Sequence, residues 1–591
     1  MRLALAQINT TVGDLDGNRA RILDAIGEAQ AARADLVLVP ELAVTGYPPE
    51  DLLLRPGFLH AAAASLREIA EAARDVVALV GFPHLERDLY NACAVCADGE
   101  VKTIYHKRFL PNYGVFDEDR YFASGRELVL LELGGTLVGP TVCEDMWQPG
   151  APATDLALAG AQLLTNISAS PFHVCRDRER QEMFGTRARD NACFVAFCNT
   201  VGGQDELIFD GNSFVLDEEG HVLARAPGFD EALLVVDIDP VDAVGRRLRD
   251  VRGRALARER FTRGEIPVLE LGALHDRREP VEPVLAEPLG ELEQMRLALE
   301  LGLRDYVEKN GFREVVIGIS GGIDSALTAA LAVEALGAER VHCVSMPSRY
   351  SSEETRRDAR RLAESLDADF RELPVQEIVG AFDAVLAQSF AGREPDLAEE
   401  NVQARIRGVL LMALSNKFGW LVVATGNKSE LSVGYATLYG DMAGGFALLK
   451  DVFKTDVFRL ARYLNERAAA GGRTGQADVA SSGASQATPR ELIPGTILER
   501  APSAELRENQ LDEDALPPYA ALDRVLEAYV EQDRSREELS HDGFDPEVVE
   551  RALALIDRAE YKRRQAPPGV RLTPKAFGRD RRTPITNRWR G

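Results

Sequence analysis

Short runs of consecutive apolar residues alternate with stretches of helical periodicity in the first half of the chain. The apolar runs are residues 36–40, 76–80, 137–142 and 161–166, and the helical stretches are residues 18–34 and 61–73. Continuous apolar runs of this length are typical of strands buried on both faces, since a strand with one wet face alternates apolar and polar residues. The first half therefore predicts an α/β sandwich.

The second half begins with a helix whose apolar residues, between 292 and 303, share one face. A strand at 315–319, a helix at 325–336 and a strand at 340–346 follow in the order of a βαβ unit, which makes the two strands parallel. Another strand, at 420–425, also ends in a polar turn. Because ligands of open α/β sheets lie at the carboxyl ends of strands, we expect the turns after the first and last of these strands to share one crevice.

Two stretches lack both periodicities. Residues 266–290 collect four prolines among Glu and Arg, which is typical of a linker, and they divide the chain into domains of residues 1–265 and 291–591. Residues from about 468 to 490 are rich in Ala, Gly, Ser and Gln without any period. We expect a mobile insertion there, within the second domain.

Composition narrows the functional classes. Of 591 residues, 45% are hydrophobic and 28% are charged, an ordinary balance for a globular protein. The formal net charge of −25 argues against a nucleic-acid partner, because phosphate contacts need clustered Lys and Arg. The chain starts without a signal-peptide pattern and contains no run of 18 apolar residues, so we expect a cytoplasmic protein with small-molecule substrates and no membrane partner.

Residues 316–326 carry the most specific chemical signal: an apolar strand, the turn Ser320-Gly-Gly-Ile-Asp-Ser, and an alanine-rich helix. The glycines let backbone N–H groups approach oxyanions, Ser320 and Ser325 add hydroxyl donors, and the start of the helix is electropositive. A Walker A loop would need Lys here, whereas the charged residue is Asp324, which repels phosphate unless a divalent cation lies between them. The segment therefore predicts a magnesium nucleotide.

This turn resembles the pyrophosphate loop of the N-type ATP pyrophosphatases, enzymes that cut ATP between its α and β phosphates to adenylate a substrate. The resemblance implies ATP as co-substrate and Mg²⁺ as cofactor. The loop alone leaves the acceptor open, because enzymes that make GMP, asparagine, argininosuccinate and modified tRNA also carry it. The acidic composition speaks against tRNA.

Three reactive residues lie at strand ends or in an aromatic turn of the first half: Glu41, Lys107 and Cys143. Each alone has an ordinary structural explanation, but together they form a chemical set. A thiolate can attack an amide carbonyl, and a free Cys near neutral pH needs a base to reach that state. Glu41 is the candidate base, and Lys107 would keep that carboxylate partly ionised and stabilise the developing oxyanion.

The same three positions resemble the Glu-Lys-Cys triad of the nitrilase superfamily, in the contexts Pro-Glu-Leu, Lys-Arg-Phe-Leu-Pro and Cys-Glu-Asp. The resemblance spans roughly residues 1–270 and implies an α-β-β-α sandwich. It makes Cys143 the nucleophile, Glu41 the proton acceptor and Lys107 the stabiliser of the transition state.

For nitrilase-like domains that hydrolyse glutamine, the resemblance also implies three substrate contacts, from Tyr113, Ser170 and Arg176. Arg176 stands where Lys is usual, so the charge is kept while its reach and geometry differ. Glu118 has two interpretations: an additional carboxylate of such a site, or a surface residue.

Five segments of the second half resemble, in order, the synthetase domain of glutamine-dependent NAD synthetases. They are Asn401-Val-Gln-Ala-Arg-Ile-Arg-Gly, Ala424-Thr-Gly-Asn-Lys-Ser-Glu-Leu, Leu438-Tyr-Gly-Asp-Met-Ala-Gly-Gly, Pro502-Ser-Ala-Glu-Leu and Leu516-Pro-Pro-Tyr. The resemblance covers essentially the whole chain and implies a doubly wound, Rossmann-like second domain with a parallel sheet. The implied reaction is adenylation of deamido-NAD by ATP and attack of ammonia, which completes NAD biosynthesis and releases AMP and pyrophosphate.

This resemblance implies a set of site residues in the second domain. For ATP they are Gly318, Ser320, Gly321, Gly322, Asp324, Ser325, Thr425, Lys454 and Ser503; for deamido-NAD they are Asn401, Glu430 and Lys562; for Mg²⁺ they are Asp324 and Glu430. Leu438 stands where free-standing, ammonia-using relatives have a substrate-contacting Lys, so that contact is not expected here.

The expected enzyme is therefore a carbon–nitrogen ligase that takes ammonia from glutamine in one domain and passes it to the other. We expect a homo-oligomer, because both parent families associate. The alternative is an amidase or carbamoylase whose second half is a regulatory ATP-binding module. Asp324 and Glu430, as paired carboxylates suited to a metal, argue against that alternative.

Overall fold

The computed structural model describes residues 1–250, 252–260, 266–275, 279–471 and 491–589. The chain forms two compact units, Met1–Gly290 and Glu291–Gly591. The insertion predicted at about 468–490 starts in the last turn of helix α14 (Lys454–Ala469), and its residues 472–490 lie outside the described residues.

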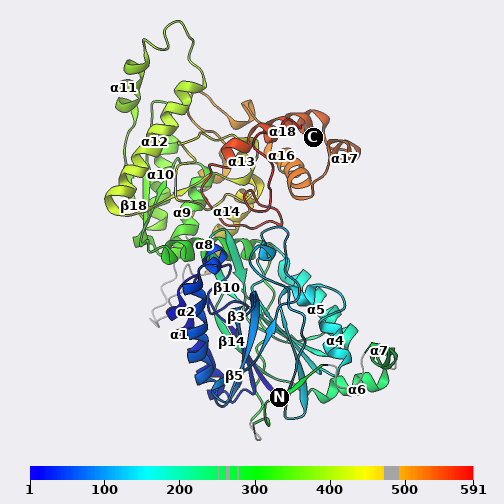
Figure 1. Cartoon of the computed structure of the whole chain (residues 1–591). Coiled ribbons are helices and arrows are strands. Elements are labelled where there is room, and N and C mark those ends of the chain that lie inside the picture. Colours follow the sequence, from blue (N-terminus) through cyan, green and yellow to red (C-terminus); the bar gives the residue numbers. More distant parts are fainter. Residues whose placement is uncertain (251, 261–265, 276–278, 472–490, 590–591) are drawn as a thin grey trace. The chain divides into compact units, whose positions relative to one another are not determined.

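Two sheets form the centre of the first unit (Figure 1). The six-stranded sheet has the order β14 (Ala232–Asp237), β1 (Arg2–Gln7), β2 (Leu36–Leu38), β3 (Val77–Leu85), β4 (Leu89–Ala97) and β5 (Glu100–His106). The seven-stranded sheet has the order β13 (Val222–Arg225), β12 (Phe214–Leu216), β9 (Phe194–Asn199), β8 (Leu163–Ser168), β7 (Thr136–Val142), β6 (Leu130–Leu133) and β15 (Val268–Glu270). An antiparallel hairpin of β10 (Val201–Gln204) and β11 (Leu207–Asp210) lies between β9 and β12 in the sequence.

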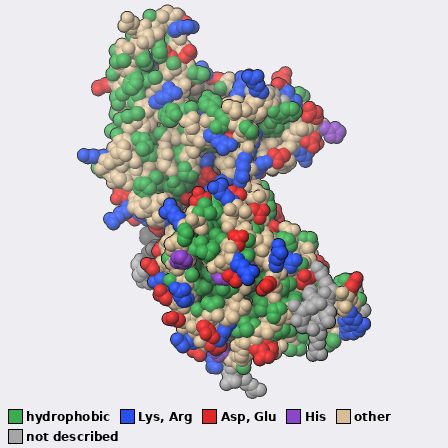
Figure 2. All heavy atoms as spheres, viewed as in Figure 1, with side chains coloured by type: hydrophobic (Ala, Val, Ile, Leu, Met, Phe, Trp, Pro, Cys, Tyr) green, Lys and Arg blue, Asp and Glu red, His purple; other side chains and the backbone are tan. Residues whose placement is uncertain are grey.

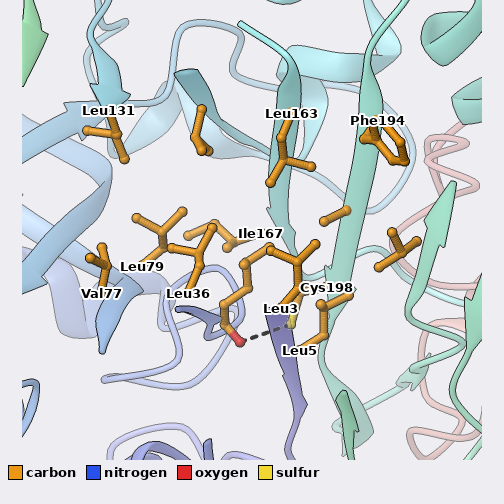
Figure 3. Packing of buried hydrophobic residues seen from close by; sticks show 14 of the residues in the cluster. Leu3, Leu5, Leu36, Val77, Leu79, Leu131, Leu163, Ile167, Phe194 and Cys198 are labelled. Carbon is orange, nitrogen blue, oxygen red and sulfur yellow. Dashed lines mark hydrogen bonds between the residues drawn. The ribbon is translucent and has the colours of Figure 1, made fainter. Parts of the chain in front are cut away.

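Strand β1 shows why these runs are apolar without interruption. Leu5 lies in the layer between the two sheets, in the same cluster as Ile167 and Cys198 of the opposite sheet (Figure 3). Ala4 and Ala6 point the other way and pack under the outer helices. Both faces are dry, so the period-2 alternation of a half-exposed strand disappears.

Helices cover the outer faces of both sheets. α1 (Leu15–Ala31) and α2 (Pro56–Ala72) pack on the six-stranded sheet, and α4 (Ala153–Leu158) and α5 (Arg176–Asn191) pack on the seven-stranded one (Figure 1). The helices α6 (Val241–Arg249) and α7 (Arg252–Arg260) follow strand β14 in the sequence. This arrangement confirms the predicted α-β-β-α sandwich.

The segment expected to be a linker contains a strand. β15 pairs in parallel with β6, matching Val268 with Leu130 and Glu270 with Glu132. Further along, the N–H of Ala286 donates to Arg225 O at 3.1 Å. Residues 268–270 and Ala286 are thus attached to the first unit by backbone hydrogen bonds. Pro267 lies outside the short strand, so the strand keeps its backbone donors.

The second unit is built on a fully parallel sheet. Its order is β18 (Asp369–Glu372), β17 (Val341–Ser345), β16 (Val315–Gly318), β19 (Leu421–Ala424) and β20 (Phe446–Ala447). The chain adds strands outward from β16 in one direction and then restarts at β19 in the other. The point of reversal therefore lies between β16 and β19, which confirms the doubly wound fold. Ligands of such sheets generally bind at the carboxyl ends of the two strands beside this point.

Helices lie on both sides of this sheet. α11 (Gln376–Leu386) and α12 (Leu397–Phe418) share an apolar cluster with β16, β17 and β19, whereas α8 (Glu291–Lys309) and α14 pack against α9 (Ile323–Leu336). α10 (Glu353–Leu366) packs on α9, β17 and β18.

A C-terminal helical cluster joins α13 (Lys428–Val433), α16 (Tyr519–Leu526), α17 (Arg536–His541) and α18 (Pro546–Arg558) through a shared apolar core, and α19 (Glu560–Arg563) follows α18. The remaining α helices are α3 (Glu144–Trp147) in the first unit and α15 (Gly495–Glu499) in the second.

Acidic and basic side chains are interspersed with apolar ones on the face shown in Figure 2. Among the helices of the described part of the chain, none combines the length and the apolar character that crossing a bilayer requires.

Candidate active sites

Cys143 lies in a tight turn between β7 and α3. Its φ of +42° falls in the left-handed region, which a non-glycine residue adopts where the surrounding structure holds it. The Cys143 N–H donates to Ile167 O at 2.9 Å, and Asn166 Nδ2 donates to Cys143 O at 3.2 Å. The neighbouring strand β8 thus fixes this turn, and the candidate nucleophile is presented at a strand end.

Asp145 ties this turn to the loop that follows β5. Its carboxylate accepts the N–H groups of Val142, Arg108 and Phe109, each at 3.0 Å, and the hydroxyl of Tyr105 at 2.8 Å. Burial raises the pKa of Asp145, and these donors work against the rise. The two segments that carry the Cys and the Lys are therefore held together by one buried carboxylate.

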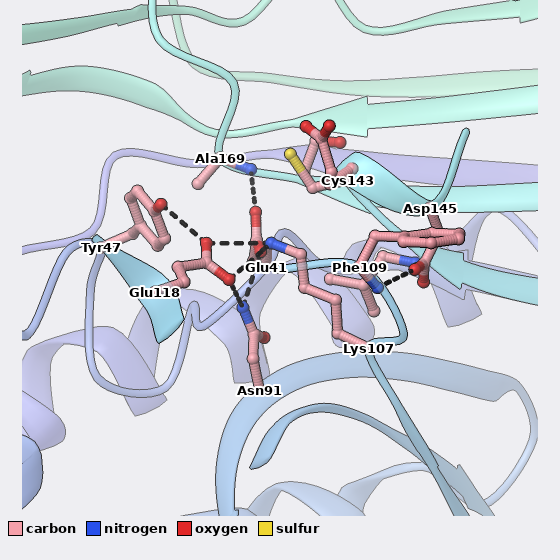
Figure 4. Close-up of polar contacts among 12 residues, drawn as sticks. Glu41, Tyr47, Asn91, Lys107, Phe109, Glu118, Cys143, Asp145 and Ala169 are labelled. Atoms are coloured by element: carbon pink, nitrogen blue, oxygen red, sulfur yellow. Dashed lines mark hydrogen bonds and ion pairs between the residues drawn. The ribbon is translucent and has the colours of Figure 1, made fainter. Parts of the chain in front are cut away.

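Lys107 lies between two glutamates (Figure 4). Its Nζ is 2.6 Å from Glu41 Oε1, and 2.9 and 2.8 Å from the two carboxylate oxygens of Glu118. The lysine side chain is fully buried, so both ion pairs lie out of water. An isolated buried ammonium would be costly, and the two carboxylates compensate it.

Neutral groups hold the two carboxylates in place. Asn91 Nδ2 donates to Glu41 Oε1 at 2.7 Å, and the Ala169 N–H donates to Glu41 Oε2 at 2.9 Å. Tyr47 donates its hydroxyl to Glu118 Oε1 at 2.9 Å. Each glutamate is thus oriented by the fold as well as by the lysine, which preorganises the site.

Burial and charge set the protonation states here. Burial, followed by the charge of Glu41, raises the pKa of the Cys143 thiol well above its usual value, although Lys107 opposes the rise. Burial raises the pKa of Glu118 to about 7, against Lys107 and with Glu41 adding to it. Burial alone would lower the pKa of Lys107, but Glu118 and Glu41 raise it well above the usual value. The thiol is therefore protonated at neutral pH, and it needs a base to react.

The surface interpretation of Glu118 is wrong. The residue is 5% exposed and is bonded to Lys107, Tyr47 and, at 3.4 Å, to Asn91. A turn before Glu118, in which the Phe116 N–H donates to Tyr113 O at 3.0 Å, precedes its contact with the lysine. Nothing in local periodicity shows that this turn folds inward.

The three predicted glutamine contacts differ in their surroundings. Ser170 is buried, and Asn199 Oδ1 accepts its N–H at 2.8 Å. Tyr113 is 55% exposed and donates its hydroxyl to Glu144 Oε2 at 2.9 Å. Arg176 stacks over the Trp147 ring at 4.2 Å and pairs with Glu179 at 2.6 Å. Burial raises the pKa of the Tyr113 hydroxyl, the charge of Glu144 adds to the rise, and the positive charge of Arg176 opposes it.

In the second unit, the loop after β16 is folded around its own hydroxyl groups. Ser320 N donates to Ser325 Oγ at 3.2 Å, and Gly322 N donates to Ser320 Oγ at 3.1 Å. Gly321 has a φ of +83°, and a Cβ there would lie 2.4 Å from Thr355 O. Glycine is required at this position both for its conformation and for the close approach of α10.

The loops after β16 and β19 meet, as their strand order predicts. Asn427 Nδ2 donates to Asp324 Oδ1 at 2.8 Å, and Lys454 Nζ lies 2.5 Å from Asp324 Oδ2 and 3.1 Å from Glu430 Oε1. Burial raises the pKa of Glu430 to about 7, against Lys454 and with Asp324 adding to it. Asp324 and Glu430, far apart in sequence, thus converge on one cation.

The predicted Mg²⁺ site requires the carboxylates of Asp324 and Glu430 to lie close together, and they do. Two carboxylates that share a buried cation position offer oxygen ligands of the kind Mg²⁺ prefers, and Mg²⁺ usually completes its shell with water and phosphate oxygens. Among the described residues, no group of three or more His, Cys, Asp or Glu side chains could hold a metal. Oxygen ligands of this kind and number fit a Mg²⁺ ion that shares its coordination shell with phosphate oxygens.

The remaining predicted residues lie around this crevice and beyond it. Ser503 Oγ donates to Gln510 O at 2.5 Å, and Thr425 follows β19. Asn401 Oδ1 accepts the Thr437 hydroxyl at 2.8 Å. Lys562 Nζ donates to the carbonyls of residues 434 and 436 at 2.7 and 2.8 Å, and burial lowers its pKa. Asn401 and Lys562 thus both contact the segment that follows α13.

Sequence reasoning missed two charged residues at this site. Asp512 is 4% exposed, accepts the Tyr519 hydroxyl at 2.9 Å, and adds its charge to those acting on Lys454. Arg407 Nε donates to Met346 O, at the end of β17, at 3.0 Å, and burial lowers the pKa of this guanidinium. The second Arg of the run that begins at residue 401 was the available signal for Arg407, whereas Asp512 follows no periodic pattern.

Comparison with known proteins gives a consistent result. The carbon-nitrogen hydrolase family model matches residues 2–247, and the NAD synthase family model matches residues 296–566. The chain is 45% identical to a glutamine-dependent NAD(+) synthetase of Thermotoga maritima, over 100% of this chain and 99% of that one, and 45% identical to one of Aquifex aeolicus, over 100% of both. The structure of a glutamine-dependent NAD+ synthetase from Acinetobacter baumannii, in complex with ADP, matches with a TM-score of 0.71 at 39% identity, over 99% of this chain and 98% of that one.

Proposed function

The chain belongs to the glutamine-dependent NAD(+) synthetase family, and on that premise we propose that it amidates deamido-NAD to NAD, using ATP and the side-chain amide of glutamine. The observation that carries the proposal is the pairing of two reactive sets in one chain. Glu41, Lys107 and Cys143 form one set, and Asp324, in the first turn of α9, and Glu430, on α13, belong to the other. An amide hydrolase alone would need only the first.

Ammonia is released in the first unit. Glu41 accepts the thiol proton of Cys143, and the thiolate attacks the glutamine amide carbon. The C–O π electrons move onto oxygen, where the Lys107 ammonium stabilises the oxyanion. Collapse breaks the C–N bond, and Glu41 returns its proton to the leaving ammonia. Water then hydrolyses the thioester, with Glu41 as base, and glutamate leaves.

The glutamine contacts remain part of this proposal. Tyr113, Ser170 and Arg176 would hold the substrate, with the Arg176 guanidinium facing its carboxylate. That role requires Arg176 to exchange Glu179 for the substrate, since the two side chains are paired at 2.6 Å. A carboxylate ligand can compete for a partly exposed ion pair, because such pairs contribute little stability.

Amidation takes place in the second unit. A carboxylate oxygen of deamido-NAD attacks the α-phosphorus of ATP, and pyrophosphate leaves with the electrons of the broken P–O bond. Asp324 and Glu430 would hold Mg²⁺, which when bound neutralises charge on the triphosphate. The loop N–H groups and the Ser320 and Ser325 hydroxyls, with Lys454, would bind the phosphates. Ammonia then attacks the adenylated carbonyl, and AMP leaves.

The other substrate residues complete the proposal. Gly318, Gly321 and Gly322 shape the loop, and Thr425 and Ser503 would contact ATP. Asn401, Glu430 and Lys562 would contact deamido-NAD. Ammonia passes to the second unit without entering bulk water, because in bulk water it would be protonated and diluted. We also propose that the enzyme works in the cytoplasm as a homo-oligomer.

The proposal is tested by NAD formation from deamido-NAD and Mg-ATP with either glutamine or ammonium as nitrogen source. Cys143→Ala should lower the glutamine-driven rate by about four orders of magnitude or more, because the nucleophile is lost, and should leave the ammonium-driven rate within about twofold. Cys96→Ala, at a buried cysteine on β4 in the core between the six-stranded sheet and helices α1 and α2, is the matched control and should keep both rates.

Two results would contradict the proposal. If the wild type forms no NAD with either nitrogen source while it hydrolyses simple amides, the amidase or carbamoylase with a regulatory ATP-binding module is correct. If Cys143→Ala removes both rates in a folded protein, the two sites are not separable in the way proposed.

A further inference from the structure

Arg500 follows α15 and contacts residues 320–322, the loop after β16 that we propose to bind phosphate. Its Nη1 donates to Gly321 O at 3.0 Å, and its Nη2 is bonded to the buried carboxylate of Asp358 on α10. The other oxygen of that carboxylate accepts the Thr496 hydroxyl at 2.8 Å. A single guanidinium therefore bridges a loop carbonyl and a fixed acid, with its charge compensated by the acid.

The carbonyl that Arg500 binds belongs to a peptide unit between two glycines. Glycine residues on both sides let this unit rotate at little steric cost, so its orientation has to be imposed from outside. In a trans peptide the C=O and the following N–H point in opposite directions. Holding Gly321 O toward Arg500 therefore directs the Gly322 N–H to the opposite side, where it now meets Ser320 Oγ at 3.1 Å.

That N–H is one of the groups proposed to bind phosphate. The contact with Thr355 restrains Gly321 from one side, since even a Cβ there would meet Thr355 O. The same Thr355 donates its hydroxyl to Glu505 Oε1 at 2.6 Å, in the segment that carries Ser503. Arg500 and Glu505 thus attach the segment of residues 495–505 to the loop and to α10 at two separate points.

We propose that Arg500 is a positioning residue for phosphate binding. It sets the peptide between Gly321 and Gly322 so that the Gly322 N–H faces the phosphates, and it fixes the Ser503 segment on the same loop. The inference rests on the proposed function for its substrate, a magnesium nucleotide that releases pyrophosphate. It assigns no bond between Arg500 and the reacting atoms.

The test is binding of Mg-pyrophosphate by calorimetry, together with the KM for ATP in ammonium-driven NAD formation. Arg500→Met should raise both the Kd for Mg-pyrophosphate and the KM for ATP about tenfold or more, since a hydrogen bond from a charged donor is lost. The kcat should fall less than the KM rises, because the loop still reaches its bound conformation once ATP is in place. Arg500→Lys should lie between wild type and Arg500→Met, because one ammonium cannot span Gly321 O and Asp358 as the fork does.

Arg340→Met is a matched control. Arg340 also donates to a backbone carbonyl, Arg313 O at 2.6 Å, and to a carboxylate, Glu308 at 3.1 Å, but at the end of the sheet where the strands begin. Its effect on Mg-pyrophosphate affinity should be below about twofold, and thermal unfolding of both variants shows whether they fold.

Three outcomes would overturn the inference: equal effects of Arg500→Met and Arg340→Met, a change in kcat without a change in the affinities, or no binding of Mg-pyrophosphate by the wild type. Failure of the proposed function is a separate result. In that case the wild type would form no NAD from ammonium, while the dependence of Mg-pyrophosphate binding on Arg500 could still be measured.

Discussion

Each unit of this protein places one buried lysine between two carboxylates, and the two arrangements differ in how they are held. In the first unit Lys107 bridges Glu41 and Glu118, and in the second Lys454 bridges Asp324 and Glu430. In both, burial raises the pKa of one glutamate, Glu118 or Glu430, to about 7. The same three charges thus appear near the Cys143 thiol and at the loop that we propose to bind phosphate.

The carboxylates of the first unit are anchored independently of the lysine. Glu41 has a backbone N–H and the Asn91 amide as donors, and Glu118 has the Tyr47 hydroxyl. In the second unit, Asn427 anchors one oxygen of Asp324, while Lys454 also lies 5.3 Å from the Tyr519 ring centroid, a second environment that accommodates a cation. We infer that Lys107 stays paired with Glu41 and Glu118 throughout the reaction. Lys454, in contrast, occupies a position between Asp324 and Glu430 that Mg²⁺ and phosphate can take over.

Among the effects that test this comparison, the largest is expected at Asp324. Asp324→Asn should lower pyrophosphate release by about three orders of magnitude with glutamine or with ammonium, because the proposed Mg²⁺ site loses a charged ligand before nitrogen enters the reaction. Glutamate release in the first unit should persist. Removal of Mg²⁺ by a chelator should reproduce this split, which is measured by assaying pyrophosphate and glutamate in the same samples.

Asp533→Asn is the control for that variant. Asp533 is also paired with a lysine, Lys575, but its side chain is 74% exposed. Both products should form at the wild-type rate. Loss of glutamate release in Asp324→Asn, or in the presence of the chelator, would mean that the first site also depends on the metal.

A smaller effect sharpens the comparison through pH. The pKa of Glu118 is raised from 4.5 to about 7, so the folded state holds this proton more tightly than the unfolded state does. Ionisation of Glu118 therefore lowers the free energy of unfolding as the pH rises from about 4.5 to about 7. Above pH 7 the decrease is complete and remains. Glu118→Gln cannot titrate, so its melting temperature relative to wild type should rise by a few degrees between pH 4.5 and pH 8.

Calorimetry of both proteins at those two pH values measures this shift. Glu68→Gln, which alters a surface carboxylate paired with Arg19 at 3.2 Å, is the control and should show a difference that is independent of pH within about one degree. A Glu118→Gln difference that stays constant with pH would show that Lys107 keeps Glu118 ionised throughout, and the description of this pair as pH-sensitive would be wrong.

The fold could be predicted because its signals are local. The run at 36–40 and the turn at 320–325 combine strand, turn and helix patterns within a few residues, and the structure has β2 and the β16–α9 turn there. The strand at 268–270 escaped prediction because three residues between prolines show no period. Its partner strand, β6, lies more than one hundred residues earlier in the sequence, so no local pattern indicates the pairing.

The candidate site could be predicted only where a residue has a characteristic neighbour in the sequence. Cys143 and Asp324 have such contexts. Glu118 and Asp512 do not, since each is brought to its lysine by a loop whose path depends on packing far along the chain. A carboxylate in a polar turn is normally exposed, so only the tertiary structure distinguishes these two.

The smallest expected effect concerns Asn199, which holds the backbone of Ser170. Its Oδ1 accepts the Ser170 N–H at 2.8 Å, and its Nδ2 donates to Gly211 O at 3.1 Å. Asn199→Ala should raise the KM for glutamine about tenfold, because Ser170, a proposed glutamine contact, loses the hydrogen bond that holds its backbone. The hydrogen bonds of Lys107, Glu41 and Glu118 are unchanged in this variant. The ammonium-driven rate should not change, and Asn191→Ala, which removes a bond to Arg187 O at the end of α5, should leave both nitrogen sources unaffected. An equal loss with ammonium would show that Asn199 supports the fold of the whole unit and not the position of Ser170.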